Sequence, residues 1–209
     1  MKKIYLLSAL IFFLVIILYA IFNFIIKPSL SRDCGGNIVA GGNSKIGGEF
    51  QLTDINSQKV NSIDVITKPA IIYFGYSYCP DVCPYDLQRN AIAVDILFDA
   101  GKEVTPIFIT IDPKRDTPER LKEFATFVHP KLIALTGSQQ EIKNVMKLFK
   151  VYGQKAKQEK LDNTDYLMDH SAFTYLVDES GMFIDYFNRK VSPEEMAKRI
   201  TCYLNSQKN

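Results

Sequence analysis

The chain has 209 residues, with 25 basic and 23 acidic side chains and a formal net charge of +2. Acidic and basic residues are interspersed, so the sequence lacks the strongly basic surface by which a protein binds nucleic acid. After the N-terminal segment, the residues from about Lys45 onward have the length of one compact domain.

The N-terminal segment predicts a membrane anchor. Lys2 and Lys3 precede an almost unbroken apolar run from Ile4 to Ile26, and about 20 apolar residues cross a bilayer core. A cleaved secretory signal has a shorter apolar region, of about 7–15 residues, and a small-residue cleavage site. The basic N-terminus favours a cytoplasmic tip, and no Arg-rich import sequence precedes the apolar run. We therefore expect a single-pass protein of a bacterial inner (cell) membrane, with its domain facing the periplasm.

The chain is expected to have three parts. Residues 1–27 form the cytoplasmic tip and transmembrane anchor, residues 28–44 a flexible, glycine-rich tether, and residues 45–209 the folded domain. Cys34 lies in the tether and Cys202 near the end of the chain. These two cysteines are expected either to form a mutual disulfide or to remain free thiols.

Within the domain, apolar patterns and turn residues predict alternating strands and helices. A short hairpin at Glu49–Thr53 and Lys59–Val60 is followed by strands at Ala70–Tyr76, Val104–Ile111, Leu132–Leu135, Ala172–Val177 and Met182–Phe187. Helices are expected over Asp86–Ala100 and from Asp116, Ser138 and Ser192, with a solvated loop at Gln154–Asp165. This alternation predicts an α/β domain in which a mixed sheet is flanked by helices.

Cys79 and Cys83 form the most informative pattern in the chain. They lie where the strand ending at Tyr76 meets the helix expected from Asp86, which is where a thioredoxin-like fold keeps its reactive thiols. The N–H groups at a helix N-terminus favour thiolate over thiol. Such a pair ligates a soft metal, closes to a disulfide or attacks one. A purely structural disulfide is the weakest alternative. A bond between Cys79 and Cys83 would close only a small loop, so it would restrict the unfolded chain little and add little stability.

His170 is the candidate third member of this group. It closely precedes the Ala172–Val177 strand, and residues 131–192 contain no proline. In thioredoxins the loop entering this strand carries a cis-proline that packs against the thiols. Because a histidine stands roughly in that place, a thioredoxin-like sheet would bring His170 close to both cysteines. The other histidine, His129, is expected to end a helix.

Two thiolates and one imidazole form a soft site of low coordination number, which suits Cu(I). Zinc usually takes a fourth protein ligand, and Asp169 is available to supply it. Asp169 otherwise orients the histidine ring or a partner. The predicted metal ligands are therefore Cys79, Cys83 and His170.

Three motifs occur in order along the domain. They are Tyr73-Phe74-Gly75-Tyr76 running into Cys79-Pro80-Asp81-Val82-Cys83-Pro84, then Ile109–Pro113 with Arg115–Pro118, and Asp169-His170-Ser171 with Tyr175–Asp178. Together they resemble the Sco (SenC) family of copper chaperones for cytochrome c oxidase. The resemblance covers about Ile46 to Leu204, and the combination of motifs is highly specific.

The resemblance implies a thioredoxin-like fold modified for metal, with copper bound by Cys79, Cys83 and His170. It implies a metallochaperone rather than an enzyme, and a partner in oxidase subunit II, which receives copper at its dinuclear site. The Asp112–Pro118 segment is expected to be a turn with a helix cap, in which only Asp112 and Arg115 are candidates for facing the site.

The competing function is a dedicated thiol–disulfide oxidoreductase that reduces the cysteines of that dinuclear site through a Cys79–Cys83 redox disulfide. One cysteine would attack and the other would resolve the mixed disulfide. The missing cis-proline and the three-residue spacer argue against a general reductase, but not against one with a single client. A peroxidase would need a threonine or arginine beside its thiolate, and residues 77–85 contain no arginine.

Overall fold

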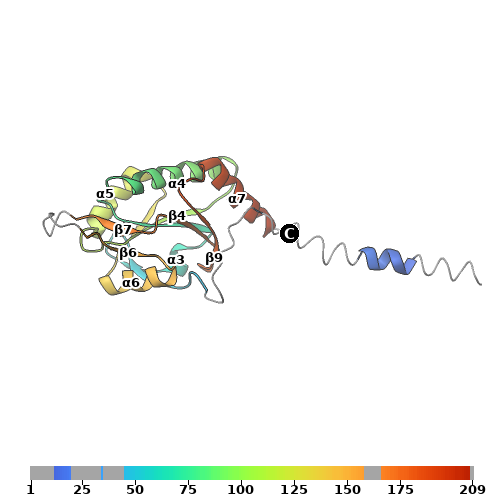
Figure 1. The fold of residues 1–209 in the computed structure, drawn as a ribbon, viewed down its shortest axis with the longest axis horizontal. Helices are drawn as coiled ribbons and strands as arrows, with labels where there is room; N and C mark the ends of the chain where they lie inside the picture. Colours follow the sequence, from blue (N-terminus) through green and yellow to red (C-terminus); the bar gives the residue numbers. More distant parts are fainter. Residues whose placement is uncertain (1–11, 20–33, 35–44, 158–165, 208–209) are drawn as a thin grey trace, which may run out of the picture.

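A mixed five-stranded sheet forms the centre of the domain in the computed structural model, which describes residues 12–19, 34, 45–157 and 166–207 (Figure 1). In spatial order the strands are β5 (Ile133–Leu135), β4 (Thr105–Thr110), β3 (Ala70–Gly75), β8 (Thr174–Val177) and β9 (Phe183–Phe187). Strands β3, β4 and β5 run parallel, whereas β8 is antiparallel to both β3 and β9. These directions confirm the predicted α/β, thioredoxin-like mixed sheet.

Helices cover both faces of this sheet (Figure 1). The helices are α3 (Ser62–Val65), α4 (Val82–Asp99), α5 (Pro118–Val128), α6 (Gln139–Leu148) and α7 (Pro193–Ser206). Helices α4 and α7 pack against each other and share a buried apolar cluster with Ile71 of β3. Ile72 and Phe74, which alternate with Ile71, belong to a second cluster with Phe149 at the end of α6. Because both faces of β3 are covered, all six of its residues are buried, as its continuous apolar sequence predicts.

The helix starts follow local capping chemistry. Ser138 and Glu141 form the reciprocal capping box of α6, and Ser192 caps α7 by accepting from the backbone N–H of Glu195. His129 is the C-terminal cap residue of α5, as predicted. Helix α4 begins at Val82, earlier than its predicted start at Asp86, so Cys83 lies inside its first turn.

Two small antiparallel pairs lie outside the central sheet. Strands β1 (Gln51–Thr53) and β2 (Lys59–Asn61) form the expected hairpin, whereas β6 (Gly153–Lys155) pairs with β7 (Met168–His170). The prediction of a solvated loop at Gln154–Asp165 was therefore wrong for Gln154 and Lys155, and its part at 158–165 lies outside the described residues. The sequence Gly-Gln-Lys has no apolar alternation, so β6 is specified by its pairing with β7 rather than by a pattern of its own.

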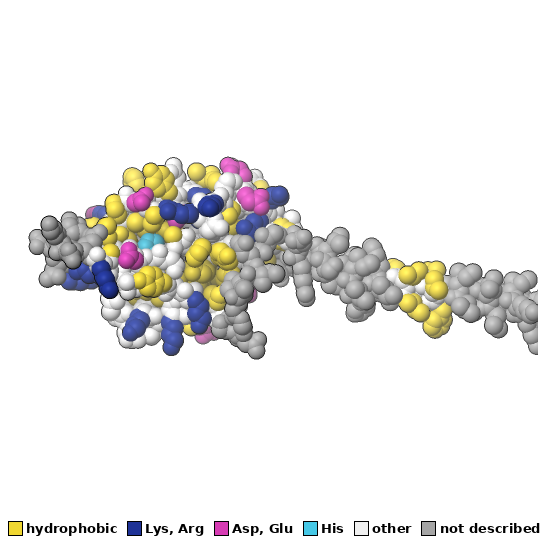
Figure 2. Space-filling model, viewed as in Figure 1, with side chains coloured by type: hydrophobic (Ala, Val, Ile, Leu, Met, Phe, Trp, Pro, Cys, Tyr) yellow, Lys and Arg dark blue, Asp and Glu magenta, His cyan; other side chains and the backbone are white. Residues whose placement is uncertain are grey.

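Most of the predicted anchor and tether lies outside the described residues. Residues 12–19 are helical and their apolar side chains are exposed (Figure 2). In the part of the chain that the structure describes, no helix is long and apolar enough to cross a membrane. Cys34 forms a disulfide with Cys202, with 5.5 Å between the two Cα atoms, which decides between the two predicted alternatives for this pair.

Candidate metal centre

The connection between β3 and α4 positions both site cysteines. Cys79 precedes α4, and Cys83 is in its first turn. The N-cap residue Asp81 makes no side-chain capping bond. Instead, the backbone N–H of Cys83 donates to Sγ of Cys79 at 3.4 Å. The sulfur thus takes the place of the usual capping oxygen, and the helix N-terminus favours its thiolate form.

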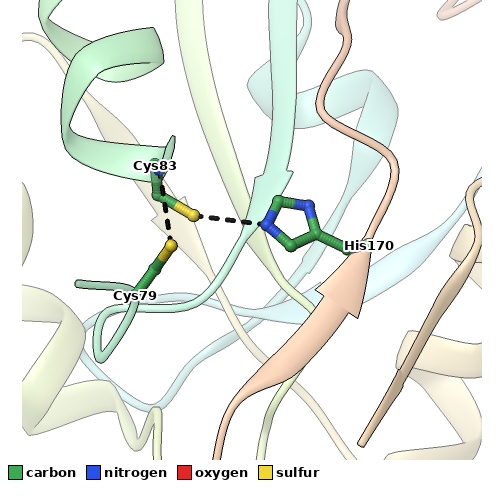
Figure 3. Close-up of side chains that lie close together, drawn as sticks. All are labelled: Cys79, Cys83 and His170. Carbon is green, nitrogen blue, oxygen red and sulfur yellow. Dashed lines mark hydrogen bonds between the residues drawn. The ribbon is translucent and has the colours of Figure 1, made fainter. Parts of the chain in front are cut away.

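His170 completes the group from the end of β7 (Figure 3). Its Nε2 lies 3.4 Å from Sγ of Cys83, across 87 residues of sequence. The candidate ligand atoms of Cys79, Cys83 and His170 all lie within 4.8 Å of one another. The structure therefore brings together the three residues that the sequence predicts as metal ligands.

A backbone carbonyl fixes the tautomer of His170. Nδ1 lies 3.0 Å from the carbonyl oxygen of Ser171, and a carbonyl only accepts hydrogen bonds. Nδ1 therefore carries the proton of the neutral ring, and Nε2 presents its lone pair to the thiols. The rings of Tyr73 and Tyr76 meet the imidazole edge to face, with centroids 6.3 and 6.0 Å away, so the ring is held on both sides.

The pKa values of the two thiols are shifted in opposite directions. The side-chain hydrogen bond from Cys83 lowers the pKa of Cys79 to about 3, against the effect of burial. Donation of its proton to Cys79, together with burial, raises the pKa of Cys83. Cys79 is 9% exposed and Cys83 only 1%. The copper-free pair is thus one reachable thiolate hydrogen-bonded to one buried thiol.

Asp116 is a positioning residue that the sequence analysis missed. Its buried carboxylate accepts from the backbone N–H and the hydroxyl of Ser77, at 3.0 and 2.6 Å, and from the hydroxyl of Thr110 at 2.6 Å. Burial raises the pKa of Asp116, and these hydrogen bonds act in the opposite direction. The position reads as a helix start, but the cap of α5 is Thr117. Asp116 instead fixes the base of the cysteine loop.

Asp112 and Arg115 connect two parts of the site rather than joining the ligands. Asp112 accepts from Nε of Arg115 at 2.5 Å and from the hydroxyl of Tyr166 at 2.8 Å. The guanidinium of Arg115 lies over the ring of Tyr166, 3.7 Å from its centroid, and 4.9 Å from that of Tyr78. This cluster links the cysteine loop to the residues that lead into β7.

Asp169 is exposed and pairs with Gln154 across β6 and β7. The metal-capable group found among the described residues does not include it, and the ring nitrogen that it was expected to orient is bonded to Ser171. The donor set is therefore two sulfurs and one nitrogen, which suits Cu(I) better than zinc. The predicted role of Asp169 toward a partner stays a prediction.

Comparison with known proteins places these features in a family. The SCO1/SenC family profile matches residues 39–205. The SenC protein of Rhodobacter capsulatus is 43% identical over 169 residues, covering 78% of this chain and 72% of that protein.

Two solved structures with copper bound are similar to this chain. Arabidopsis thaliana ScoI has a TM-score of 0.71 and 35% identity, covering 77% of this chain and 98% of the other. Bradyrhizobium japonicum ScoI has a TM-score of 0.67 and 40% identity, with 76% and 99% covered.

Proposed function

This chain belongs to the SCO1/SenC family, and from that premise we propose that it is a copper metallochaperone. Copper is its cargo, held by Cys79, Cys83 and His170. The recipient is the dinuclear copper site of cytochrome c oxidase subunit II, as the family resemblance implies. The observation that carries the proposal is the convergence of three soft ligand atoms within 4.8 Å, with the lone pair of Nε2 directed at the thiols.

The chemistry of the three residues suits reversible copper binding. Cys79 is already a thiolate at neutral pH because its pKa is low, so binding there releases no proton. Cys83 must lose its proton, and its raised pKa makes binding weaker at low pH. A site with two sulfurs and one nitrogen leaves Cu(I) open to an incoming thiolate, which supports transfer by ligand exchange.

The proposal is tested by loading the reduced full chain, in detergent micelles, with Cu(I) under anaerobic conditions. We expect one copper per chain, lost in Cys79→Ala, Cys83→Ala and His170→Ala. The matched controls are His129→Gln and the double variant Cys34→Ser/Cys202→Ser, which keep all three ligands and should retain copper. Retention of copper by His170→Ala, or its loss in both controls, would contradict the assignment.

The asymmetry of the two thiols favours a second candidate function, a dedicated thiol–disulfide oxidoreductase. The Cys79 thiolate would attack a disulfide of subunit II, forming a mixed disulfide and releasing one partner thiolate. Cys83, once deprotonated, would attack the sulfur of Cys79 and release the second partner thiol. The partner is then reduced by two electrons, and this chain is left with a Cys79–Cys83 disulfide.

His170 separates the two functions. Alanine at this position should abolish copper retention, while exchange with a disulfide needs only the two cysteines. An oxidised subunit II domain that is reduced equally fast by the wild type and His170→Ala would support the reductase. Copper transfer that requires His170, with no reduction of that domain, would support the metallochaperone alone.

We also propose that residues 4–26 anchor the chain in a bacterial inner membrane with the domain in the periplasm. The support is the apolar run behind Lys2 and Lys3 and the Cys34–Cys202 disulfide, which is typical of an oxidising compartment. A membrane-bound chaperone is concentrated near a membrane-bound recipient. The test is digestion of spheroplasts by added protease: the domain should be cut in intact spheroplasts, and its protection would contradict this orientation.

A further inference from the structure

A groove of about 810 Å³ lies between α6 and the β6–β7 pair. Its floor is apolar and includes Met146 of α6, Met168 of β7 and Val151, which precedes β6. Val151 is buried, and Met146 and Met168 are half-buried. None of the three candidate copper ligands lines this groove, so it is a separate feature from the copper site.

Four exposed lysines surround the groove, and we call the whole feature the lysine groove. They are Lys114, Lys143, Lys147 and Lys155. The acidic residue in its wall, Asp112, is buried and bonded to Arg115 and Tyr166. Among the described residues no ion pair neutralises any of the four lysines. The rim is therefore strongly positive around an apolar floor. Basic side chains gather over α6 on the face drawn in Figure 2.

The lysine groove borders the strand that carries the histidine ligand. Met168 and His170 are two residues apart on β7, which is about 7 Å along an extended chain. Gly153, which also lines the groove, pairs directly with His170 across the two strands. A segment lying in the groove would therefore end within reach of the copper ligands.

We propose that the lysine groove is the docking surface for an acidic segment with an apolar centre on the copper-accepting protein. Carboxylates on that segment would pair with the lysines, and its apolar side chains would cover the methionine floor. Charge complementarity of this kind raises the rate of encounter and fixes orientation. An anionic membrane fits less well, because a broad lipid surface does not enter a concave groove. This inference rests on the proposed copper-transfer function.

The test measures the rate of copper transfer from the Cu(I)-loaded full chain to a defined probe. The probe is the reduced, copper-free soluble domain of oxidase subunit II from the same organism. The groove variant is Lys143→Glu/Lys147→Glu, and the matched control is Lys122→Glu/Lys190→Glu, which changes the same net charge at exposed lysines outside the groove. Lys143→Gln/Lys147→Gln is a milder second variant, since neutral side chains disturb α6 less.

We expect the glutamate variant of the groove to transfer copper at least tenfold more slowly at low salt, and the glutamine variant to fall in between. The control should stay within twofold of the wild type, and all proteins should bind one copper. Equal transfer rates in every protein would overturn the groove assignment and leave the chaperone function standing. Absence of transfer from the wild type would overturn both.

The membrane alternative is tested with the full chain in nanodiscs. In nanodiscs of phosphatidylcholine alone, which carries no net charge, the tenfold difference between the groove variant and the wild type should persist. A difference that appears only when phosphatidylglycerol is present would assign the lysines to the lipid surface and overturn the proposal.

Discussion

The two sides of the candidate metal centre are built differently. The thiol side lies between the central strand β3 and the N-terminus of α4, and the buried carboxylate of Asp116 fixes its loop through three hydrogen bonds. Gly75 allows close packing there, since a Cβ at that position would lie 3.0 Å from Sγ of Cys83. The histidine side is the short strand β7, which pairs with β6 alone among the described strands.

The hydrogen bonds on the histidine side lie nearer the surface of the domain. The hydroxyl of Tyr76 accepts from the backbone N–H of Met168 at 3.2 Å, and Ser171 and Tyr152 exchange hydrogen bonds at 3.0 and 3.1 Å. The thiol side is thus organised before copper arrives, because Asp116, Thr110 and both cysteines are buried in the core of the domain. The histidine side is the more easily displaced part, and a partner docked beside β7 would act on it first.

The largest expected effect is on how the alkylation rate of Cys79 depends on pH. Since the pKa of Cys79 is about 3, its thiolate persists in acid, and its reaction with iodoacetamide should change little between about pH 8 and pH 5. An ordinary thiol loses roughly a thousandfold of its thiolate over that interval. The measurement is the alkylation rate of the reduced, copper-free chain, followed by mass spectrometry.

The matched control for this prediction is Cys83→Ala. It removes the hydrogen bond that contributes most to the low pKa of Cys79, so alkylation of Cys79 should become more dependent on pH. A wild-type rate that falls tenfold for each pH unit would contradict the described thiol pair.

The next largest effect is expected from Asp116→Ala. Removing this carboxylate leaves the buried hydroxyl of Thr110 and the half-buried donors of Ser77 without their acceptor, so the free energy of unfolding should fall by about 3 kcal/mol. Urea unfolding of the copper-free chain measures it. The exposed Asp169→Ala is the control and should change stability by less than about 0.5 kcal/mol. Equal effects of the two variants would show that Asp116 does not support the loop.

Removing the Cys34–Cys202 disulfide should lower stability without touching either side of the metal centre. The double variant Cys34→Ser/Cys202→Ser is expected to lower the free energy of unfolding by about 2 kcal/mol, because the unfolded chain loses a constraint. Copper stoichiometry should remain one per chain. Urea unfolding and metal analysis on the same sample test both statements, and a loss of copper would contradict the separation of this disulfide from the site.

The smallest effect is expected on the histidine side, from Tyr76→Phe. This change removes the hydroxyl that accepts from Met168 but keeps the ring beside His170, so stability should fall by about 1 kcal/mol. Copper affinity should fall by about threefold, as measured by competition with a Cu(I) chelator. Tyr175→Phe, which leaves the hydrogen bond to Met168 and both rings beside His170 in place, is the control. Equal losses of affinity would contradict a specific role for the Tyr76 hydroxyl.

The sequence predicts the thiol side far better than the histidine side. The apolar run of β3, the capping box at Ser138 and the cysteines at a strand-to-helix turn are local patterns, and the structure confirms them. The strands β6 and β7 have no such pattern, so their pairing depends on tertiary contacts. His170 could be placed only through a thioredoxin-like arrangement. Asp116 reads as a helix start because Ser77, the loop residue that it holds, is 39 residues away.

The most direct test of the account is X-ray absorption at the copper edge of the anaerobic, Cu(I)-loaded full chain. We predict one copper bound by two sulfurs and one nitrogen in the wild type and in His129→Gln, and no bound copper in His170→Ala. A spectrum with sulfur ligands only, or one unchanged by His170→Ala, would contradict the three-residue centre.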